Sequence, residues 1–327
     1  SELARAFHIP ESQVRLIVPD AGGAFGGKHT GETAVEAARL AKAAGKPVSL
    51  RWTREEEFTW AYFRPAGLME VAAGIDRNGR LVAWEFTNYN SGASALRTPY
   101  EVPNRREQFR YSDSPLREGS YRVLAATANN FAREAFLDEV AALSGADPLE
   151  YRLRHLKEER MIAVLKAAAE RFGWEKRRAR KEPGTGIGIA CGTEKGSFVA
   201  ACVAVSVDRR RGNLKIEQIC QAFECGAIQN PRNLLAQAEG CLIMTLGAVL
   251  KEEIRFEQGR ILNAKFSQYP VPRFRDIPPV ETVLVNRPDL PSVGAGETPM
   301  IAAPPAISNA IFVASGLRLL TLPFKSA

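Results

Sequence analysis

Tight turns join the strand candidates of this sequence, and this feature restricts its fold more than any other. Two β-rich stretches at about 68–75 and 81–87 flank the turn sequence D-R-N-G, and two more at 197–207 and 214–222 flank D-R-R-R-G. A third hairpin is expected around Gly259. Because helices and hairpins alternate without a regular strand–helix–strand order, the sequence predicts an α+β fold with two lobes of mixed β-sheets packed with helices.

Helices are expected where apolar residues recur at intervals of three and four and turn residues mark the ends. The Ala-rich stretch before Gly45 has this pattern, and Asp147-Pro148 has the residue types of an N-cap and a first helical position. Thr53 and Glu56 have the spacing of a capping box, directly after a strand candidate at 48–52. The expected helices cover residues 30–44, 129–143, 160–174 and 231–249, together with one that ends at Gly316.

Residues 22–28 read G-G-A-F-G-G-K, which contains the G-x-x-x-x-G-K spacing that opens a phosphate-binding P-loop. The turn follows a short strand candidate at 15–19 and precedes the helix expected at 30–44, so its backbone N–H groups could face an anion. A P-loop also needs Ser or Thr after the lysine to bind magnesium, and here that residue is His29. Phe25 would crowd a backbone that has to wrap around phosphates. We therefore expect no nucleotide at this turn.

The composition is that of an ordinary globular protein. The chain has 327 residues, of which 45% are hydrophobic and 25% charged, and this length suggests about two domains. The basic stretch at 175–186 is the expected linker between a first lobe at 1–174 and a second lobe at 187–327. The polar loop at 101–122 is long enough to serve a site. No run of about 18 apolar residues exists, so we expect no membrane span.

Neither the charge nor the metal-binding residue types define a site. The net charge is +7, but the basic runs have no interleaved aromatic residues, so we expect no nucleic-acid partner. Cys220 and Cys225 have the spacing that opens a plant-type iron–sulfur motif, but the third ligand position is Ile228. The histidines are scattered along the chain. We therefore expect neither an iron–sulfur cluster nor a metal held by the side chains of this chain.

Three further stretches have unusual residue combinations. They are "LREGSYRVLAATANNFARE" at 116–134, "AFECGAIQNPRNLLAQAEG" at 222–240 and "SVGAGETPMIAAPPAISNAIF" at 292–312. Together with the glycine turn at 22–28, and in this order, they resemble the molybdopterin-binding large subunit of the xanthine dehydrogenase and aldehyde oxidase family. Within that family the sequence looks most like the isoquinoline 1-oxidoreductase beta-subunit type, and the resemblance runs the length of the chain.

The resemblance implies that the glycine turn helps to hold the molybdenum cofactor. Phe25 and Gly26 match the turn that lies against the molybdenum site in this family. Tyr121 and Arg122 match an aromatic–arginine pair whose backbone approaches the oxygen ligands of the metal, although the family usually has Phe where Tyr121 stands. From the residues alone, core packing would explain Phe25 and Tyr121 equally well.

The resemblance also implies a catalytic glutamate. Glu297 matches the family's general base, and Gln237 matches a glutamine that hydrogen-bonds the pterin. This family hydroxylates a carbon beside a ring nitrogen, or an aldehyde carbon, with oxygen from water. Such a reaction needs a proton acceptor, and a buried carboxylate suits that task. The residues alone allow two other interpretations: Glu297 as an acidic residue that complements a helix dipole, and Gln237 as a polar residue on a helix surface.

Partners follow from the same resemblance. Family members carry an M-G-Q-G-like segment that grips the cofactor and a β-hammerhead portion, and residues 1–327 contain neither. We therefore expect the C-terminal half of a molybdopterin subunit, which shares a molybdenum–molybdopterin cofactor with an N-terminal half or a separate chain. Electrons would pass to a 2Fe–2S subunit and then to a flavin or cytochrome acceptor. The alternative is a non-catalytic assembly or scaffold subunit that keeps the fold without the cofactor.

Overall fold

The structure is a computed structural model that describes residues 1–20, 22–180 and 182–324. Its internal contacts divide the chain into two compact units. Unit 1 contains Ser1–Pro65, Ser114–Arg122 and Ile254–Gln268, and unit 2 contains Ala66–Asp113, Val123–Glu253 and Tyr269–Ala327. These units differ from the lobes expected at 1–174 and 187–327, which stay a prediction about how cofactor binding is divided along the chain.

The core of unit 2 is a four-stranded sheet in the order β4-β5-β6-β9. Strands β4, β5 and β6 are antiparallel, and β9 joins β6 in parallel. The D-R-R-R-G turn connects β5 to β6 and forms the expected hairpin. The sheet consists of β4 (Thr185–Glu194), β5 (Ser197–Asp208), β6 (Asn213–Glu224) and β9 (Val280–Val285).

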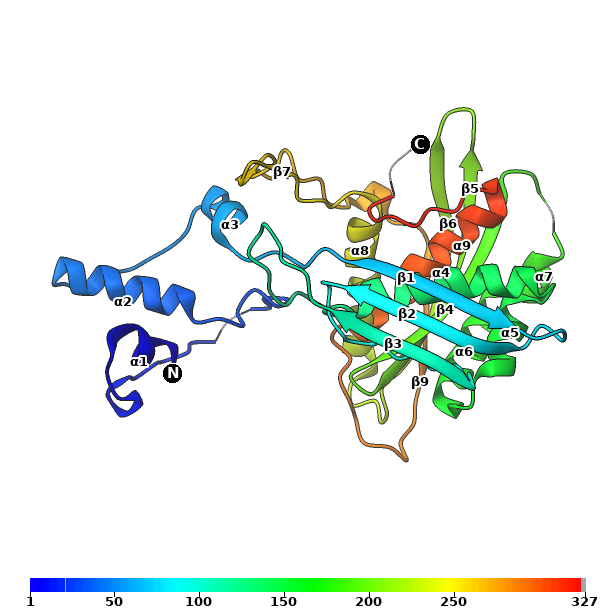
Figure 1. Ribbon diagram of the computed structural model, residues 1–327, viewed down its shortest axis with the longest axis horizontal. Coiled ribbons are helices and arrows are strands. Elements are labelled where there is room, and N and C mark those ends of the chain that lie inside the picture. Colours follow the sequence, from blue (N-terminus) through cyan, green and yellow to red (C-terminus); the bar gives the residue numbers. More distant parts are fainter. Residues whose placement is uncertain (21, 181, 325–327) are drawn as a thin grey trace. The chain divides into compact units, whose positions relative to one another are not determined.

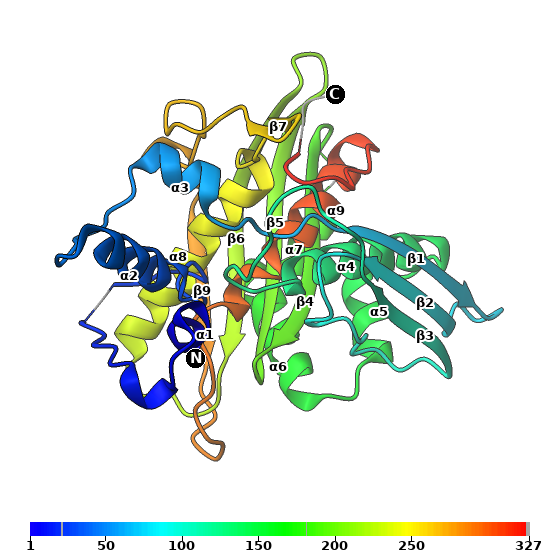
Figure 2. The ribbon, with the colours of Figure 1, turned by 60° about the vertical axis from the view of Figure 1, so that its left-hand side comes forward.

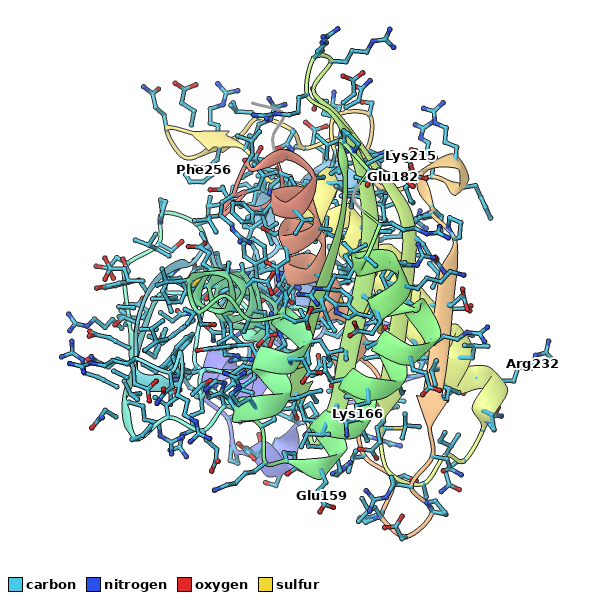
Figure 3. All side chains as sticks on the ribbon, turned by 90° about the vertical axis from the view of Figure 1, so that its right-hand side faces the viewer. Glu159, Lys166, Glu182, Lys215, Arg232 and Phe256 are labelled. Atoms are coloured by element: carbon cyan, nitrogen blue, oxygen red, sulfur yellow. The ribbon has the colours of Figure 1, made fainter. Side chains whose placement is uncertain are left out.

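Helices cover both faces of this sheet, which explains why β5 is an almost unbroken apolar run. Ala200 and Cys202 belong to the core that includes α6, whereas Val199 and Val203 belong to the core that includes α8 and α9. Figure 3 shows α6 in front of the long strands, and α9 lies along β4 and β5 (Figure 2). The three helices are α6 (Glu159–Phe172), α8 (Pro231–Leu250) and α9 (Ala303–Ser315).

Two glycines of β4 allow α9 to pack this closely. A Cβ at Gly186 would lie 2.1 Å from the carbonyl oxygen of Ala310, and a Cβ at Gly188 would lie 2.1 Å from that of Ala306. The backbone of the helix therefore approaches the strand more closely than any side chain would permit.

A second sheet of unit 2 has the order β1-β2-β3. Strands β1 and β2 are antiparallel around the D-R-N-G turn, as expected, and β3 pairs in parallel with β2 inside the loop predicted at 101–122. Trp84 and Phe86 of β2 share a core with Leu137 and Val140 of α4. The elements are β1 (Leu68–Ile75), β2 (Leu81–Tyr89), β3 (Asn104–Arg110) and α4 (Ala126–Leu143), all visible in Figure 1.

A buried ion cluster joins α4 to α5 (Pro148–His155). The fully buried Arg152 donates from Nε to Oε2 of Glu134 at 2.9 Å and from Nη1 to Oδ1 of Asp138 at 2.8 Å. Tyr100 donates to Oε1 of Glu134 at 2.8 Å. Burial opposes the charge of Arg152, but the carboxylates of Glu134 and Asp138 hold its pKa well above the usual value. Burial also raises the pKa of Asp138.

Unit 1 consists of short helices and a small hairpin around very little buried apolar surface. Helix α1 contacts α2, and α3 contacts β8. Among the described residues of unit 1, Ala4 and Tyr62 are the only buried hydrophobic ones. The elements are α1 (Glu2–Phe7), η1 (Glu11–Gln13), α2 (Glu32–Ala44), α3 (Arg54–Trp60), β7 (Phe256–Glu257) and β8 (Arg260–Ile261).

Local signals predicted helix ends correctly, but two predicted strands are wrong. Gly45 ends α2 in the left-handed conformation, and Thr53 and Glu56 form the capping box. The segments 15–19 and 48–52 form no strand. A strand needs a neighbour to pair with its backbone N–H and C=O groups, and neither segment has one within the described chain.

The expected linker at 175–186 is partly regular. Helix α7 covers Trp174–Arg178, and β4 begins at Thr185. Lys181 of this stretch lies outside the described residues. Unit 2 also contains the 3-10 turns η2 (Phe274–Asp276) and η3 (Thr298–Met300).

Helix α8 differs from the expectation that no segment could span a membrane. By length and composition alone it could cross one: the mean hydropathy of its most apolar window is 1.4, and 39% of that window is buried. The sequence predicts this helix at 231–249, but Gln237 and Glu239 interrupt any continuous apolar run and so conceal its high mean hydropathy. The helix contacts η3, β9 and α9 within unit 2, as a core helix does.

Candidate functional site

In unit 1, the glycine turn packs backbone against backbone on the segment that ends at Arg122. Phe25 and Gly26 have positive φ values of 52° and 113°, and the Phe25 carbonyl accepts a hydrogen bond from the Arg122 N–H at 2.7 Å. A Cβ at Gly26 would lie 2.2 Å from the carbonyl oxygen of Ser120 and 2.7 Å from Cα of Tyr121. Only glycine fits there, so the structure brings the four predicted residues of this unit together.

Tyr62 and Arg64 hold this arrangement, and the sequence analysis missed both. The Tyr62 hydroxyl donates to the Gly26 carbonyl, and its ring lies edge-on to that of Tyr121 with the centroids 5.6 Å apart. Arg64 donates from Nη2 to the Arg122 carbonyl at 2.6 Å. Burial, with a contribution from Tyr62, raises the pKa of Tyr121, so its phenol is protonated at neutral pH. No sequence motif marks Tyr62 or Arg64.

Phe25 is not a core residue, so that interpretation of it is wrong. Its side chain is 52% exposed, whereas Arg122 is only 8% exposed. The guanidinium of Arg122 lies 5.2 Å from the centroid of the Phe25 ring, within the range of a cation–π contact. The aromatic ring thus lies against a buried arginine while about half of it remains exposed.

Two donors, one in the glycine turn and one just after it, are engaged by the protein itself. Lys28 donates from Nζ to the Gly22 carbonyl at 2.8 Å. At the N-terminus of α2, the Gly31 N–H donates to the carboxylate of Glu2 at 3.0 Å. The absence of a nucleotide from this turn stays a prediction.

In unit 2, Glu297 is held by a strained turn. Its Oε2 accepts a hydrogen bond from the Val123 N–H at 2.7 Å, and Val123 and Leu124 have φ values of 74° and 52°. A β-branched residue with positive φ is an uncommon backbone outlier, and such strain often occurs at functional sites. Within the described chain the side chain of Glu297 makes no capping hydrogen bond to η3. Its carboxylate is therefore directed to the Val123 turn, and not to the end of the helix that follows it.

The backbone on each side of Glu297 is fixed as well. Gln237 of α8 donates from Nε2 to the Gly296 carbonyl at 3.0 Å. Thr298 donates from Oγ1 to the last carbonyl of β4 at 2.8 Å and accepts from Oγ of Ser197 at 2.7 Å. The structure thus brings Gln237 close to Glu297 through the intervening Gly296. Ser197 and Thr298 were not anticipated from the sequence.

The predicted residues fall into two groups. Phe25, Gly26, Tyr121 and Arg122 belong to unit 1, and Gln237 and Glu297 belong to unit 2; the chain passes from one unit to the other between Arg122 and Val123.

No side-chain cluster among residues 1–20, 22–180 and 182–324 has three or more His, Cys, Asp or Glu residues that could hold a metal ion. The five cysteines are free and buried, and burial raises the pKa of Cys191 to about 12.

Comparison with known proteins defines the class. Residues 1–156 and 194–278 each match a model of the molybdopterin cofactor-binding domain. Quinoline 2-oxidoreductase from Pseudomonas putida 86 has the same fold, with a TM-score of 0.84, 16% identity and coverage of 96% of this chain and 68% of that chain. Aldehyde oxidoreductase from Desulfovibrio gigas also has this fold, with a TM-score of 0.79, 17% identity and coverage of 92% of this chain and 53% of that chain. The fold is therefore that of a molybdopterin cofactor-binding domain, and the α+β expectation is confirmed.

The chain belongs to the xanthine dehydrogenase and aldehyde oxidase family, as its motifs predict. One subunit of the nicotinate dehydrogenase of Pseudomonas putida is 30% identical over 364 residues, which cover 100% of this chain and 31% of that protein. The beta subunit of isoquinoline 1-oxidoreductase from Brevundimonas diminuta is 27% identical over 345 residues, which cover 98% of this chain and 44% of that protein. The chain thus spans less than half the length of these relatives.

Proposed function

We propose that this chain is part of a molybdenum hydroxylase, in which Glu297 accepts the proton released when an N-heteroaromatic or aldehyde carbon is oxidised with oxygen from water. One observation carries the proposal. Oε2 of Glu297 is anchored by the Val123 N–H at 2.7 Å, while Oε1 accepts no hydrogen bond from the part of the chain that the structure describes. A carboxylate with one oxygen anchored and the other open is suited to take up a proton at Oε1.

The surroundings of Glu297 support this role because they fix its position before any substrate binds. On one side of Glu297, Gln237 holds Gly296 by a hydrogen bond. On the other side, Ser197 and β4 hold Thr298. The turn that anchors its carboxylate is strained, and strain persists only where neighbouring structure enforces it. Such preorganisation places a proton acceptor without a loss of side-chain freedom at the moment of reaction.

The residues of each unit fit a molybdenum–pterin group. In unit 2, Gln237 offers an amide oxygen that accepts no hydrogen bond from the described residues, and a pterin ring carries N–H donors for such an oxygen. In unit 1, Phe25, Gly26, Tyr121 and Arg122 would hold the group, as the family resemblance implies. When bound, the cofactor would supply the two-electron redox chemistry of the reaction.

Other subunits are part of the proposal. Both relatives are named as subunits, and the chain spans 31% and 44% of their length. We infer that an N-terminal half or a separate chain completes the molybdopterin subunit. A 2Fe–2S subunit would receive the electrons, followed by a flavin or cytochrome acceptor. The second candidate is a non-catalytic assembly subunit that keeps the fold without the cofactor, and the anchored Glu297 supports the first candidate.

The test is Glu297→Gln in the assembled enzyme, with turnover normalised to bound molybdenum. Glutamine keeps the shape and can still accept the Val123 hydrogen bond, but it cannot take up the proton. Because general base catalysis contributes about 10²–10⁴-fold, turnover should fall by at least about 10²-fold at unchanged molybdenum content. Glu281→Gln is the matched control, since this glutamate on β9 pairs with Arg171 and Gln218. Near-normal turnover in Glu297→Gln would refute the assignment, and an assembled wild-type complex without molybdenum would favour the assembly subunit.

A further inference from the structure

An apolar segment of unit 1 is exposed to solvent on both of its faces. Leu16, Ile17 and Val18 are consecutive, and their side chains are 64%, 72% and 76% exposed. Since side chains alternate along an extended backbone, such a run presents branched apolar groups to both sides at once. A run of this kind is typical of a strand that is buried on both faces of a sheet.

The backbone of this segment is also unpaired. Val14 has the extended conformation, with φ −104° and ψ 124°. From Arg15 to Pro19 the backbone forms no hydrogen bond with the rest of the described chain. Unpaired N–H and C=O groups beside apolar side chains form an edge that can accept another strand.

Unit 1 has no core of its own that could cover the segment. Its only buried hydrophobic residues, within the described ranges, are Ala4 and Tyr62. The backbone of the segment at 48–52, which follows α2, is likewise unpaired within the described chain. Trp52 of this segment donates from Nε1 to Glu36 of α2 at 2.9 Å. The order of segment, helix and segment is that of a β–α–β unit. In this chain, however, the segments at 15–19 and 48–52 form no ladder of backbone hydrogen bonds with each other.

We propose that segment 14–18 pairs with a β-strand of the polypeptide that completes the molybdopterin subunit, and that this pairing is how the two parts of the subunit join. The proposal rests on the partner inferred under the proposed function. The relatives are more than twice as long as this chain, so they have additional polypeptide from which a pairing strand could come. Backbone pairing would supply the affinity, and the exposed Leu16, Ile17 and Val18 would be buried on the two faces of the completed sheet.

Hydrogen–deuterium exchange tests the pairing directly. The enzyme purified from its native host is compared with the 327-residue chain expressed alone. The amides of residues 16–18 should exchange about 100-fold more slowly in the assembled enzyme, because ladder hydrogen bonds protect them. Equal exchange in the two samples would overturn the proposal.

The variant Ile17→Pro tests it a second way, because proline cannot donate to a ladder. When the remaining part of the molybdopterin subunit is co-expressed as a separate polypeptide, at least about tenfold less of the Ile17→Pro chain should co-purify with it. The circular dichroism of the lone chain should stay unchanged, because Ile17 is 72% exposed. Leu143→Asp, at a 78% exposed leucine of α4, is the control and should assemble normally. Normal assembly of Ile17→Pro would refute the proposal. The proposal would also be refuted if the lone chain forms a dimer and Ile17→Pro abolishes that dimer, since a second copy of the chain would then be the partner. Normal strand protection together with an active Glu297→Gln enzyme would refute the proposed function alone.

Discussion

Replacement of Arg152 by methionine should destabilise unit 2 far more than the loss of a surface ion pair. Arg152 is fully buried and donates to the carboxylates of Glu134 and Asp138 and to the carbonyl oxygens of Pro148 and Glu134. Methionine is apolar and of similar length, so the substitution removes the charge and these hydrogen bonds while it keeps most of the packing. Asp138 then remains buried without this cation, whereas Glu134 keeps the buried guanidinium of Arg133, whose Nε lies 3.8 Å from Oε1 of Glu134.

The contacts that remain indicate which carboxylate is affected most. Glu134 keeps hydrogen bonds from the Tyr100 hydroxyl at 2.8 Å and the Cys191 N–H at 3.1 Å. Asp138, which is 7% exposed, loses the hydrogen bond from Arg152 at 2.8 Å, the only one that it accepts within the described chain. Removal of one partner of a buried ion pair costs about 3–5 kcal/mol. We therefore expect the free energy of unfolding to fall by about 4 kcal/mol.

Urea unfolding at pH 7 and pH 5, followed by tryptophan fluorescence and circular dichroism, measures this loss. Arg171→Met is the matched control, since its ion pair with Glu281 is 62% exposed on the arginine side, and it should change stability by less than about 1 kcal/mol. Burial already raises the pKa of Asp138, and loss of Arg152 should raise it further. A carboxyl group whose folded pKa is raised stabilises the fold below its unfolded pKa, and that contribution is lost as the pH rises through the folded pKa. The deficit of Arg152→Met should therefore be smaller at pH 5 than at pH 7. A loss of less than about 1 kcal/mol, or a loss that does not depend on pH, would refute the reasoning.

Two predictions concern the glycine turn of unit 1. Gly26→Ala should lower the molybdenum content of the assembled enzyme, since its Cβ would lie 2.2 Å from a backbone oxygen at a φ of 113°. Gly22→Ala is the control and should retain the metal, because nothing lies within 4 Å of a Cβ at that position. Equal molybdenum content in the two variants by elemental analysis would show that the packing of Gly26 is unimportant. Tyr62→Phe removes the hydroxyl that donates to Gly26 and should reduce stability by about 0.5–1.5 kcal/mol, and Tyr89→Phe, whose hydroxyl binds the exposed Glu70, is the control in the same thermal melts.

Helices and hairpins could be predicted because their signals are local. Gly45 and the Thr53–Glu56 box mark helix ends by their own residue types. The parallel pairing of β2 with β3, and of β6 with β9, could not be predicted, since long connections separate these strands and no turn sequence fixes their register. The prediction of strands at 15–19 and 48–52 failed for a different reason. Their residues favour extended structure, but a strand also needs a neighbour, and the described chain supplies none.

The candidate site shows the same division between what a residue type reveals and what only the fold reveals. Gly26 could be named from the glycine turn that resembles the family's turn, and the structure supplies the reason, since no other residue fits against Ser120 and Tyr121. Val123 lies 174 residues before Glu297 and anchors it through a backbone N–H. Every residue except proline can supply that group, so the sequence at this position carries no signal of its role. A strained turn that aims one N–H at one carboxylate is defined by its dihedral angles alone, and this is why Glu297 could be named from its motif while the residue that holds it could not.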